Sequence, residues 1–268
     1  SGTPAGGIPS GVVTSGIEAI SVYNNSTAAY EVDAALMAGI SDVYINGGAN
    51  ATTVDDVDTL ANMHLISTNV NAEISPAAGV ATGTADEAVI LSNGSAQVSS
   101  MTATYNGVEV INFSAAGTTG LKTATADRSL TLASTDLEKV VVTGDADANL
   151  TVDLDGAALD TQTSEFDASA AGGKITAHVT VGDSENAAIT MSAQDDYVNF
   201  NGAIVRTYTL DGGEGSDYLQ LDTDLTYSTA DATAGLAQKG SGISNFEALR
   251  LESGVDVDET AMPNNAGI

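Results

Sequence analysis

The stretch Ile17-Glu18-Ala19-Ile20-Ser21-Val22 sets the pattern on which the predicted fold depends. Its apolar residues Ile17, Ile20 and Val22 stand at positions i, i+3 and i+5. The last two follow strand alternation, which puts both side chains on one face, and the first turns into the strand from a corner. The same spacing recurs at Ile40/Val43/Ile45, Leu60/Met63/Leu65, Val108/Ile111/Phe113, Leu137/Val140/Val142 and Phe246/Leu249/Leu251.

The distance between copies predicts a solenoid. The first three copies begin at Ile17, Ile40 and Leu60, and two later ones begin at Val108 and Leu137. Within the first three and within the later pair, the starting points are about 20–30 residues apart, and such periods, built from short strands and tight corners, are typical of stacked coils. The sequence therefore predicts an all-β fold, a parallel β-helix (β-solenoid). β-sandwich domains are the alternative.

Local composition predicts three parts. Residues 1–15 include Pro4, Pro9 and several glycines, which indicates a flexible lead-in. Residues 16–252 carry the predicted β-solenoid. Residues 253–268 are acidic and then rich in asparagine, which indicates a tail or linker.

The charge balance excludes several functions. The 268 residues carry 36 acidic side chains against 7 lysines and arginines, a net charge of −29. Such a chain has no track for nucleic acid or for an anionic membrane surface, and no apolar run approaches the length of a spanning helix. It has no cysteine, which excludes disulfides and thiolate metal sites. Its many carboxylates suit hard cations such as Ca²⁺, which take six to eight oxygen ligands.

The clearest motif is Gly212-Gly213-Glu214-Gly215-Ser216-Asp217-Tyr218-Leu219-Gln220, which matches G-G-x-G-x-D-x-U-x with U a large apolar residue. The glycines turn the backbone so that its carbonyls face a cation, Asp217 adds a carboxylate, and Leu219 anchors a short strand. The motif predicts a calcium site in a portion of the solenoid around 190–225. A plain solvent-exposed turn is the alternative.

A second copy without the glycines precedes the nonamer, at Asp195-Asp196-Tyr197-Val198-Asn199-Phe200. A coil whose length equals the spacing between the two copies would stack Asp196 beside Asp217. The neighbours that would complete this site are Asp195, Asp211 and Glu214. A weaker prediction of cation ligands falls on a second acidic cluster, for which a solvated edge is the alternative. Its members are Asp145, Asp147, Asp153 and Asp155.

Catalysis finds little support, and the chain is predicted not to be an enzyme. It contains no G-x-S-x-G nucleophile motif. His64 and His178, the two histidines, lie in predicted strands. The acidic surplus leaves room for the paired carboxylates of a polysaccharide-cleaving β-helix, but aromatic and basic residues that would line its cleft are scarce. No catalytic residue and no residue for an organic cofactor is predicted.

The nonamer at 212–220 resembles the repeat of RTX proteins, the calcium-binding exports of the type I secretion route. The repeats that begin at Ile17, Val108 and Phe246 look like the strand repeats of Gram-negative S-layer proteins, which combine them with RTX nonamers in a calcium-stabilised β-helix. The resemblance covers most of the chain in style but only the nonamer in strict motif, and tandem nonamers are missing. It implies that Asp217 is a side-chain calcium ligand. Carbonyl or nearby oxygen would come from Gly213, Gly215 and Asp211.

The resemblance also implies a function. The chain would be a structural component of a bacterial surface layer, secreted to the cell surface and stabilised by calcium. Its partners would be further copies of itself in a lattice, and lipopolysaccharide or another cell-surface glycan through a part not in this chain. The alternatives are an RTX-type adhesin or stalk module, and a non-catalytic segment of a secreted RTX enzyme.

Overall fold

The structure is a computed structural model, and it describes residues 14–93, 100–116, 129–154, 163–182, 186–205, 207–225, 239–252 and 254–257. Within them the regular structure is β-strand, apart from a short 3₁₀ turn, η1, at Lys239–Gly242. The predicted lead-in and tail lie almost entirely outside the described residues. The chain divides into two compact units, Ser1–Leu137 and Glu138–Ile268.

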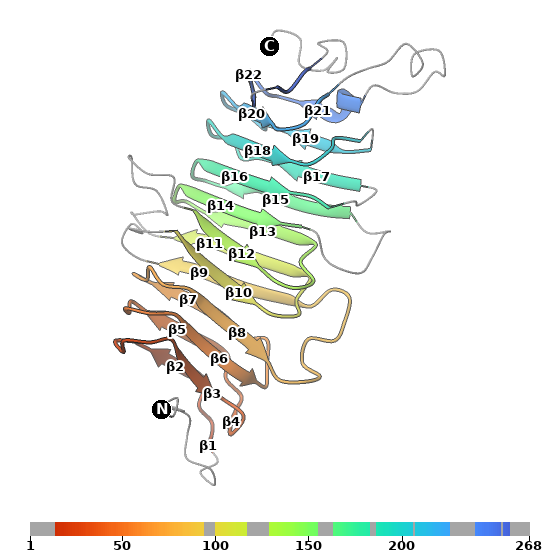
Figure 1. Ribbon diagram of the computed structural model, residues 1–268. Coiled ribbons are helices and arrows are strands. Elements are labelled where there is room, and N and C mark those ends of the chain that lie inside the picture. The colour runs from red at the N-terminus through yellow and green to blue at the C-terminus, as the bar shows by residue number, and fades with distance from the viewer. Residues whose placement is uncertain are drawn as a thin grey trace. The chain divides into compact units, whose positions relative to one another are not determined.

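Unit 1 winds through two parallel sheets (Figure 1). Its strands are β1 (Thr14–Ser15), β2 (Ala19–Val22), β3 (Tyr30–Asp33), β4 (Met37–Ala38), β5 (Asp42–Asn46), β6 (Thr52–Val57), β7 (Asn62–Ile66), β8 (Ala72–Pro76), β9 (Glu87–Asn93), β10 (Met101–Tyr105), β11 (Val110–Ala116) and β12 (Leu130–Ala133). One sheet has the order β2-β5-β7-β9-β11, the other has the order β3-β6-β8-β10-β12, and β1 pairs with β4.

Unit 2 repeats this plan. Its strands are β13 (Lys139–Gly144), β14 (Ala148–Asp153), β15 (Thr163–Ala171), β16 (Ile175–Thr180), β17 (Asn186–Thr190), β18 (Tyr197–Asn201), β19 (Thr209–Asp211), β20 (Tyr218–Leu221), β21 (Ile243–Ser244) and β22 (Ala248–Leu251). They form the orders β13-β15-β17-β19-β21 and β14-β16-β18-β20-β22. Successive strands alternate between the two sheets, so each pair of strands makes about one coil (Figure 1).

The ladders between described strands are parallel, which confirms the predicted parallel β-helix. A sandwich would pair its strands as antiparallel hairpins. In β11, for example, Val110 to Ala116 lie directly opposite Glu87 to Asn93 of β9. Residues at equivalent positions therefore form columns from coil to coil, about 4.8 Å apart.

The repeated apolar spacing builds the core. In β11 burial alternates, and Ile111 and Phe113 have no exposed surface. Val108, the first residue of that copy, is equally buried at the corner before the strand. Five copies lie on β2, β5, β7, β11 and β13, whereas the copy that begins at Phe246 lies on β22, in the other sheet of unit 2 from β13.

Truncation of Phe113 to alanine tests this core. The side chain is fully buried, so Phe113→Ala removes apolar contacts and leaves a cavity, at an expected cost of about 3–5 kcal/mol in the free energy of unfolding. Ser114→Ala, one residue along on the outward face of β11, is the matched control and is expected to cost less than about 0.5 kcal/mol. Urea unfolding followed by circular dichroism measures both. Equal losses would contradict the assigned inward face.

Candidate functional site

Acidic residues form a column at one corner of unit 2. The first residue of β16 and the residues just before β18, β20 and β22 occupy equivalent positions in successive coils, because Thr176 pairs with Tyr197, Tyr197 with Tyr218 and Tyr218 with Ala248. The column comprises Ile175 at its base, then Asp196, Asp217 and Glu247. Asp196 and Asp217 are 0% and 1% exposed, which is unusual for carboxylates. The sequence prediction that Asp196 stacks beside Asp217 agrees with this register.

Asp196 has hydrogen-bond donors for both of its carboxylate oxygens. The Ile175 N–H, in the coil below, donates to Oδ1 at 2.7 Å. The Ser192 N–H and hydroxyl donate to Oδ2 at 2.8 and 2.7 Å. Burial raises the pKa of Asp196, and these hydrogen bonds oppose the rise. The carboxylate therefore links the backbone at Ile175 to the backbone at Ser192.

Asp217 has a donor for only one oxygen. The Asp196 N–H donates to Oδ1 at 2.7 Å. Oδ2 is buried and has no hydrogen-bond partner among the residues that the structure describes. Burial raises the pKa of Asp217 to about 6, and the negative charges of Asp196, Glu247 and Asp195 add to the rise. A buried carboxylate oxygen among like charges is stabilised by a cation, a proton or a hydrogen-bonded water.

Two glutamates for which the sequence predicts no role, Glu247 and Glu109, accept the same kind of hydrogen bond from a corner N–H. The Asp217 N–H donates to Glu247 Oε2 at 2.7 Å. In unit 1 the Asp86 N–H donates to Glu109 Oε2, also at 2.7 Å, and Glu109 is only 8% exposed. Both glutamates directly follow the first apolar residue of a repeat, a recurrence that could have signalled this role. Each satisfies a corner N–H that strand pairing leaves free.

The glycines of the nonamer allow the corner to contact adjacent coils closely. A Cβ on Gly213 would lie 2.0 Å from the Ser192 carbonyl oxygen, and one on Gly215 would lie 2.5 Å from that of Gln194. Both glycines also have positive φ, +90° and +132°. A Cβ on Gly212 would lie 1.8 Å from the Asn245 carbonyl oxygen. Stacking alone thus requires glycine at these three positions, with or without a cation.

Of the other ligands predicted around the nonamer, two accept hydrogen bonds and the third is exposed. Asp195 Oδ1 accepts a hydrogen bond from the Ser216 N–H at 2.9 Å. Asp211 Oδ1 accepts from the Gly213 N–H at 3.1 Å and from Asn245 Nδ2 at 2.7 Å. Glu214 is exposed.

The second predicted cluster is divided by a strand. Asp145 and Asp147 precede β14, whereas Asp153 is its last residue. Asp147 Oδ1 accepts a hydrogen bond from the Lys174 N–H at 2.9 Å. Asp145 and Asp153 are exposed, and Asp155 lies outside the described residues. The strand therefore separates Asp153 from the two acids that precede it.

In the described ranges, no group of three or more carboxylate or histidine side chains lies close enough together to hold a metal ion. Oxygen atoms near the nonamer include Asp217 Oδ2, the carboxylates of Asp195, Asp211 and Glu214, and backbone carbonyls. Among the carbonyls that crowd this corner are those of Ser192, Gln194 and Asn245. Calcium accepts both carboxylate and carbonyl oxygen, and a calcium ion at this corner stays a prediction.

The two histidines have contacts typical of strand residues. Nε2 of His64 lies 2.8 Å from Asp42 Oδ1, and its ring stacks on Tyr44 with the centroids 4.2 Å apart. The hydrogen bond with His64 is the largest cause of a lowered pKa at Asp42. His178 lies beside Tyr197, with the ring centroids 6.4 Å apart. These contacts agree with a structural interpretation, and the absence of enzymatic activity stays a prediction.

Comparison of the chain with protein-family models, with curated proteins and with solved structures finds no match. The interpretation of the column therefore depends on its own chemistry.

Asp217→Asn tests the electrostatic strain at the column. Asparagine keeps an oxygen for the Asp196 N–H but has no charge. The pKa of Asp217 in the folded protein, about 6, lies above its ordinary value of 3.8, so the folded state holds the proton more tightly. The stability that this gives is complete below about pH 4 and is lost as the pH rises through 6.

In chelator, wild type and Asp217→Asn are therefore expected to differ with pH. The variant should gain stability relative to wild type between pH 4.5 and pH 7.5, measured by urea unfolding at both values. Subtracting one protein from the other removes the contribution of the acids that do not interact with Asp217. A difference that stays constant across this range would contradict the unpartnered state of Oδ2.

Proposed function

We propose that this protein is a structural component of a bacterial surface layer, a β-solenoid that calcium stabilises and that self-assembles into a lattice on the cell surface. The observation that supports it most directly is that Asp217 Oδ2, in a corner that resembles an RTX repeat, is buried and has no donor among the residues that the structure describes. The repeats of the S-layer kind, now seen as stacked coils, give the second support.

Calcium would be held by Asp217 together with backbone carbonyls of the corner, and it would supply positive charge where three other carboxylates face Asp217. The chain's own residues prepare the site. The Asp196 and Asp217 N–H groups hold the carboxylates of Asp217 and Glu247 in place through hydrogen bonds. Binding to the folded state alone would then stabilise the fold by mass action.

A net charge of −29 also suits a calcium-rich exterior. Lateral approach of such chains meets repulsion unless cations neutralise exposed acids. The described residues contain no helix that is long and apolar enough to span a bilayer. Attachment to the cell would use lipopolysaccharide or another cell-surface glycan, bound through a part not in this chain.

Calcium is expected to raise the melting temperature. Extracellular modules bind calcium at about 10⁻⁴–10⁻³ M, so about 1 mM calcium should add about 0.4–1.4 kcal/mol, equivalent to about 1–6 °C. Scanning calorimetry in calcium, in magnesium and in chelator measures this shift. Asp217→Asn should lose the shift, whereas Glu31→Gln, at an exposed acid on β3 of unit 1, should keep it. An identical melt in calcium and chelator would refute the calcium part of the proposal.

Assembly is the second test. Purified protein at millimolar calcium is expected to form ordered two-dimensional arrays in negative-stain electron microscopy, and chelator is expected to disperse them. Single particles at every calcium concentration, with the thermal shift intact, would favour the adhesin or stalk module over the coat.

A further inference from the structure

A second column of residues runs beside the acidic column at the corner of unit 2. Each of its members directly precedes a member of the inner column, which contains the buried Asp196 and Asp217. The pairing of β14, β16, β18, β20 and β22 aligns this outer column from coil to coil. In chain order it consists of Asp147, Lys174, Asp195, Ser216 and Phe246. Lys174 is the one cation in it, with an aspartate at the equivalent position in the preceding coil and in the next.

Backbone hydrogen bonds hold the outer column in register. The Lys174 N–H donates to Asp147 Oδ1 at 2.9 Å, and the Ser216 N–H donates to Asp195 Oδ1, also at 2.9 Å. Lys174 precedes the inward Ile175, so its own side chain faces outward, where it is half-buried. Since successive coils lie about 4.8 Å apart, the lysine stands between two carboxylates, one on each side along the axis.

The positive charge of Lys174 also acts on the inner column. Burial raises the pKa of Asp196, the hydrogen bonds from Ile175 and Ser192 oppose the rise, and the charge of Lys174 opposes it as well. Lys174 has no short ion pair to a single acid in the part of the chain that the structure describes. Its charge is therefore shared among the carboxylates of the adjacent coils.

Asp217 has an anion at the place where Asp196 has this lysine. Lys174 stands in the coil before Asp196 and one residue outside it, and Asp195 stands in the same relation to Asp217. Burial raises the pKa of Asp217, and the charge of Asp195 is among those that add to the rise. Asp217 Oδ2 is buried without a donor among the described residues, whereas both oxygens of Asp196 have donors. Two equivalent positions thus carry opposite charges.

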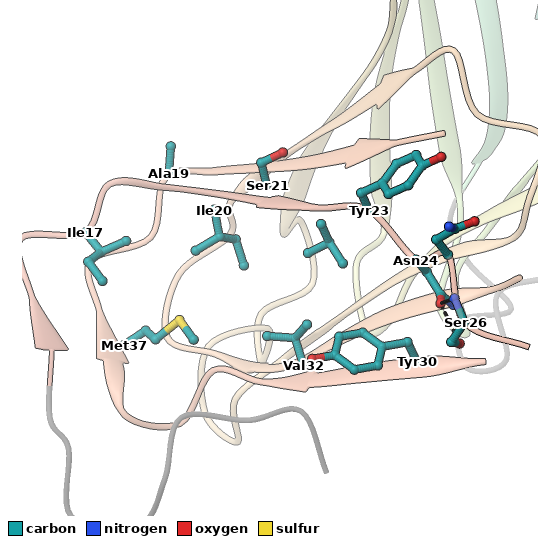
Figure 2. Close-up of a pocket in the computed structure, with 12 residues that line it drawn as sticks. Ile17, Ala19, Ile20, Ser21, Tyr23, Asn24, Ser26, Tyr30, Val32 and Met37 are labelled. Atoms are coloured by element: carbon teal, nitrogen blue, oxygen red, sulfur yellow. Dashed lines mark hydrogen bonds between the residues drawn. The ribbon is translucent and has the colours of Figure 1, made fainter. Parts of the chain in front are cut away.

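Stacking of coils does not by itself require an acid at a corner. Asn24, between β2 and β3 of unit 1, is 3% exposed, and its amide donates to the Asn50 and Ala51 carbonyls of the adjacent coil at 3.0 and 2.8 Å. Its Oδ1 accepts the Ser26 N–H at 3.0 Å, and Figure 2 shows these two residues side by side. Such a corner needs no counter-ion. The acids in unit 2 create a need for positive charge that this neutral corner avoids.

We propose that Lys174 is the resident cation of this corner, and that it confines the binding of a divalent cation to the coil of Asp217. Neither column contains a lysine or an arginine beyond Lys174, so positive charge at Asp217 has to come from solution. The assignment of the ion rests on the proposed function and deepens it, because it explains why one coil needs calcium and the coil before it does not. The counter-ion role of Lys174 does not depend on calcium.

Removal of the lysine charge in chelator tests the counter-ion role. At pH 7.5, Lys174→Gln is expected to raise the equilibrium constant for unfolding about threefold to tenfold in urea titrations, because adjacent carboxylates lose a shared cation. Lys174→Arg keeps the charge and should stay within about twofold of wild type.

The same substitution in a background without the two flanking charges is the control. Asp147→Asn with Asp195→Asn keeps an oxygen for each capped N–H, and there Lys174→Gln should change the constant by at most about twofold. An equal effect of Lys174→Gln in both backgrounds would overturn the proposal.

Transfer of the lysine to the next coil tests the assignment of the ion. Asp195→Lys puts a cation beside Asp217 in the place that Lys174 has beside Asp196. Asp195→Gln is the matched control, because it removes the same carboxylate and the same acceptor for the Ser216 N–H but adds no charge. In scanning calorimetry, Asp195→Lys should melt at a higher temperature than Asp195→Gln in chelator. It should also have at most half of the calcium-dependent shift of that control.

A double variant tests the same point in the opposite direction. Asp217→Asn alone is expected to lack the calcium-dependent shift. Addition of Lys174→Gln should restore a shift, because the preceding coil then lacks its own cation. Addition of Lys139→Gln should not, although it removes the same charge from β13 and breaks an ion pair of 2.9 Å with Glu165.

The two sets of measurements separate this inference from the proposed function. Identical melting of wild type in calcium and in chelator would refute the proposed calcium binding, and the comparison in chelator would still decide the role of Lys174. A normal calcium shift in wild type, with Asp195→Lys and Asp195→Gln alike in calcium and in chelator, would overturn this inference alone.

Discussion

The fold depends on how each corner satisfies its backbone N–H groups. Strand pairing supplies partners along the sheets, but a tight corner between sheets leaves donors that would be costly if buried alone. Here a carboxylate from the adjacent coil accepts them, as Asp196 does for Ile175 and Glu109 does for Asp86. The contact is charge-assisted and short, and it ties each corner to the one stacked on it.

The same device explains part of the chain's acidity and sets a limit on it. In the column of Asp196, Asp217 and Glu247, each capping acid brings a negative charge and the next acid lies one coil away, about 4.8 Å along the axis. Asp196 offsets this with three donors, whereas Asp217 has one donor and three negative neighbours. Consecutive caps therefore accumulate repulsion that hydrogen bonds alone do not remove.

The fold could be predicted from the sequence because the apolar spacing shows directly which side chains face inward. It also placed Asp196 beside Asp217, since the spacing between the two similar segments equals the length of one coil and so fixes the register. It could not separate capping from ligation, because that distinction depends on which N–H lies beneath each carboxylate. Asp147 and Asp153 looked like one cluster, yet β14 lies between them. In the sequence, Glu247 is only a glutamate that recurs at the same place in several repeats. Its role as a hydrogen-bond acceptor could not be predicted, because the N–H that it accepts belongs to an adjacent coil.

Capping through the main chain has a consequence for how such a protein changes over generations. Asp217 accepts the N–H of residue 196 whatever side chain stands there, and Asp196 does the same for residue 175. Loss of the one coil of chain between these two acids would bring Asp217 directly over Ile175 with an equivalent donor beneath it. Recombination can therefore remove or duplicate whole coils without a compensating substitution at the joint. The length of the solenoid is thus freer to evolve than its cross-section, where every inward side chain must fit its neighbours.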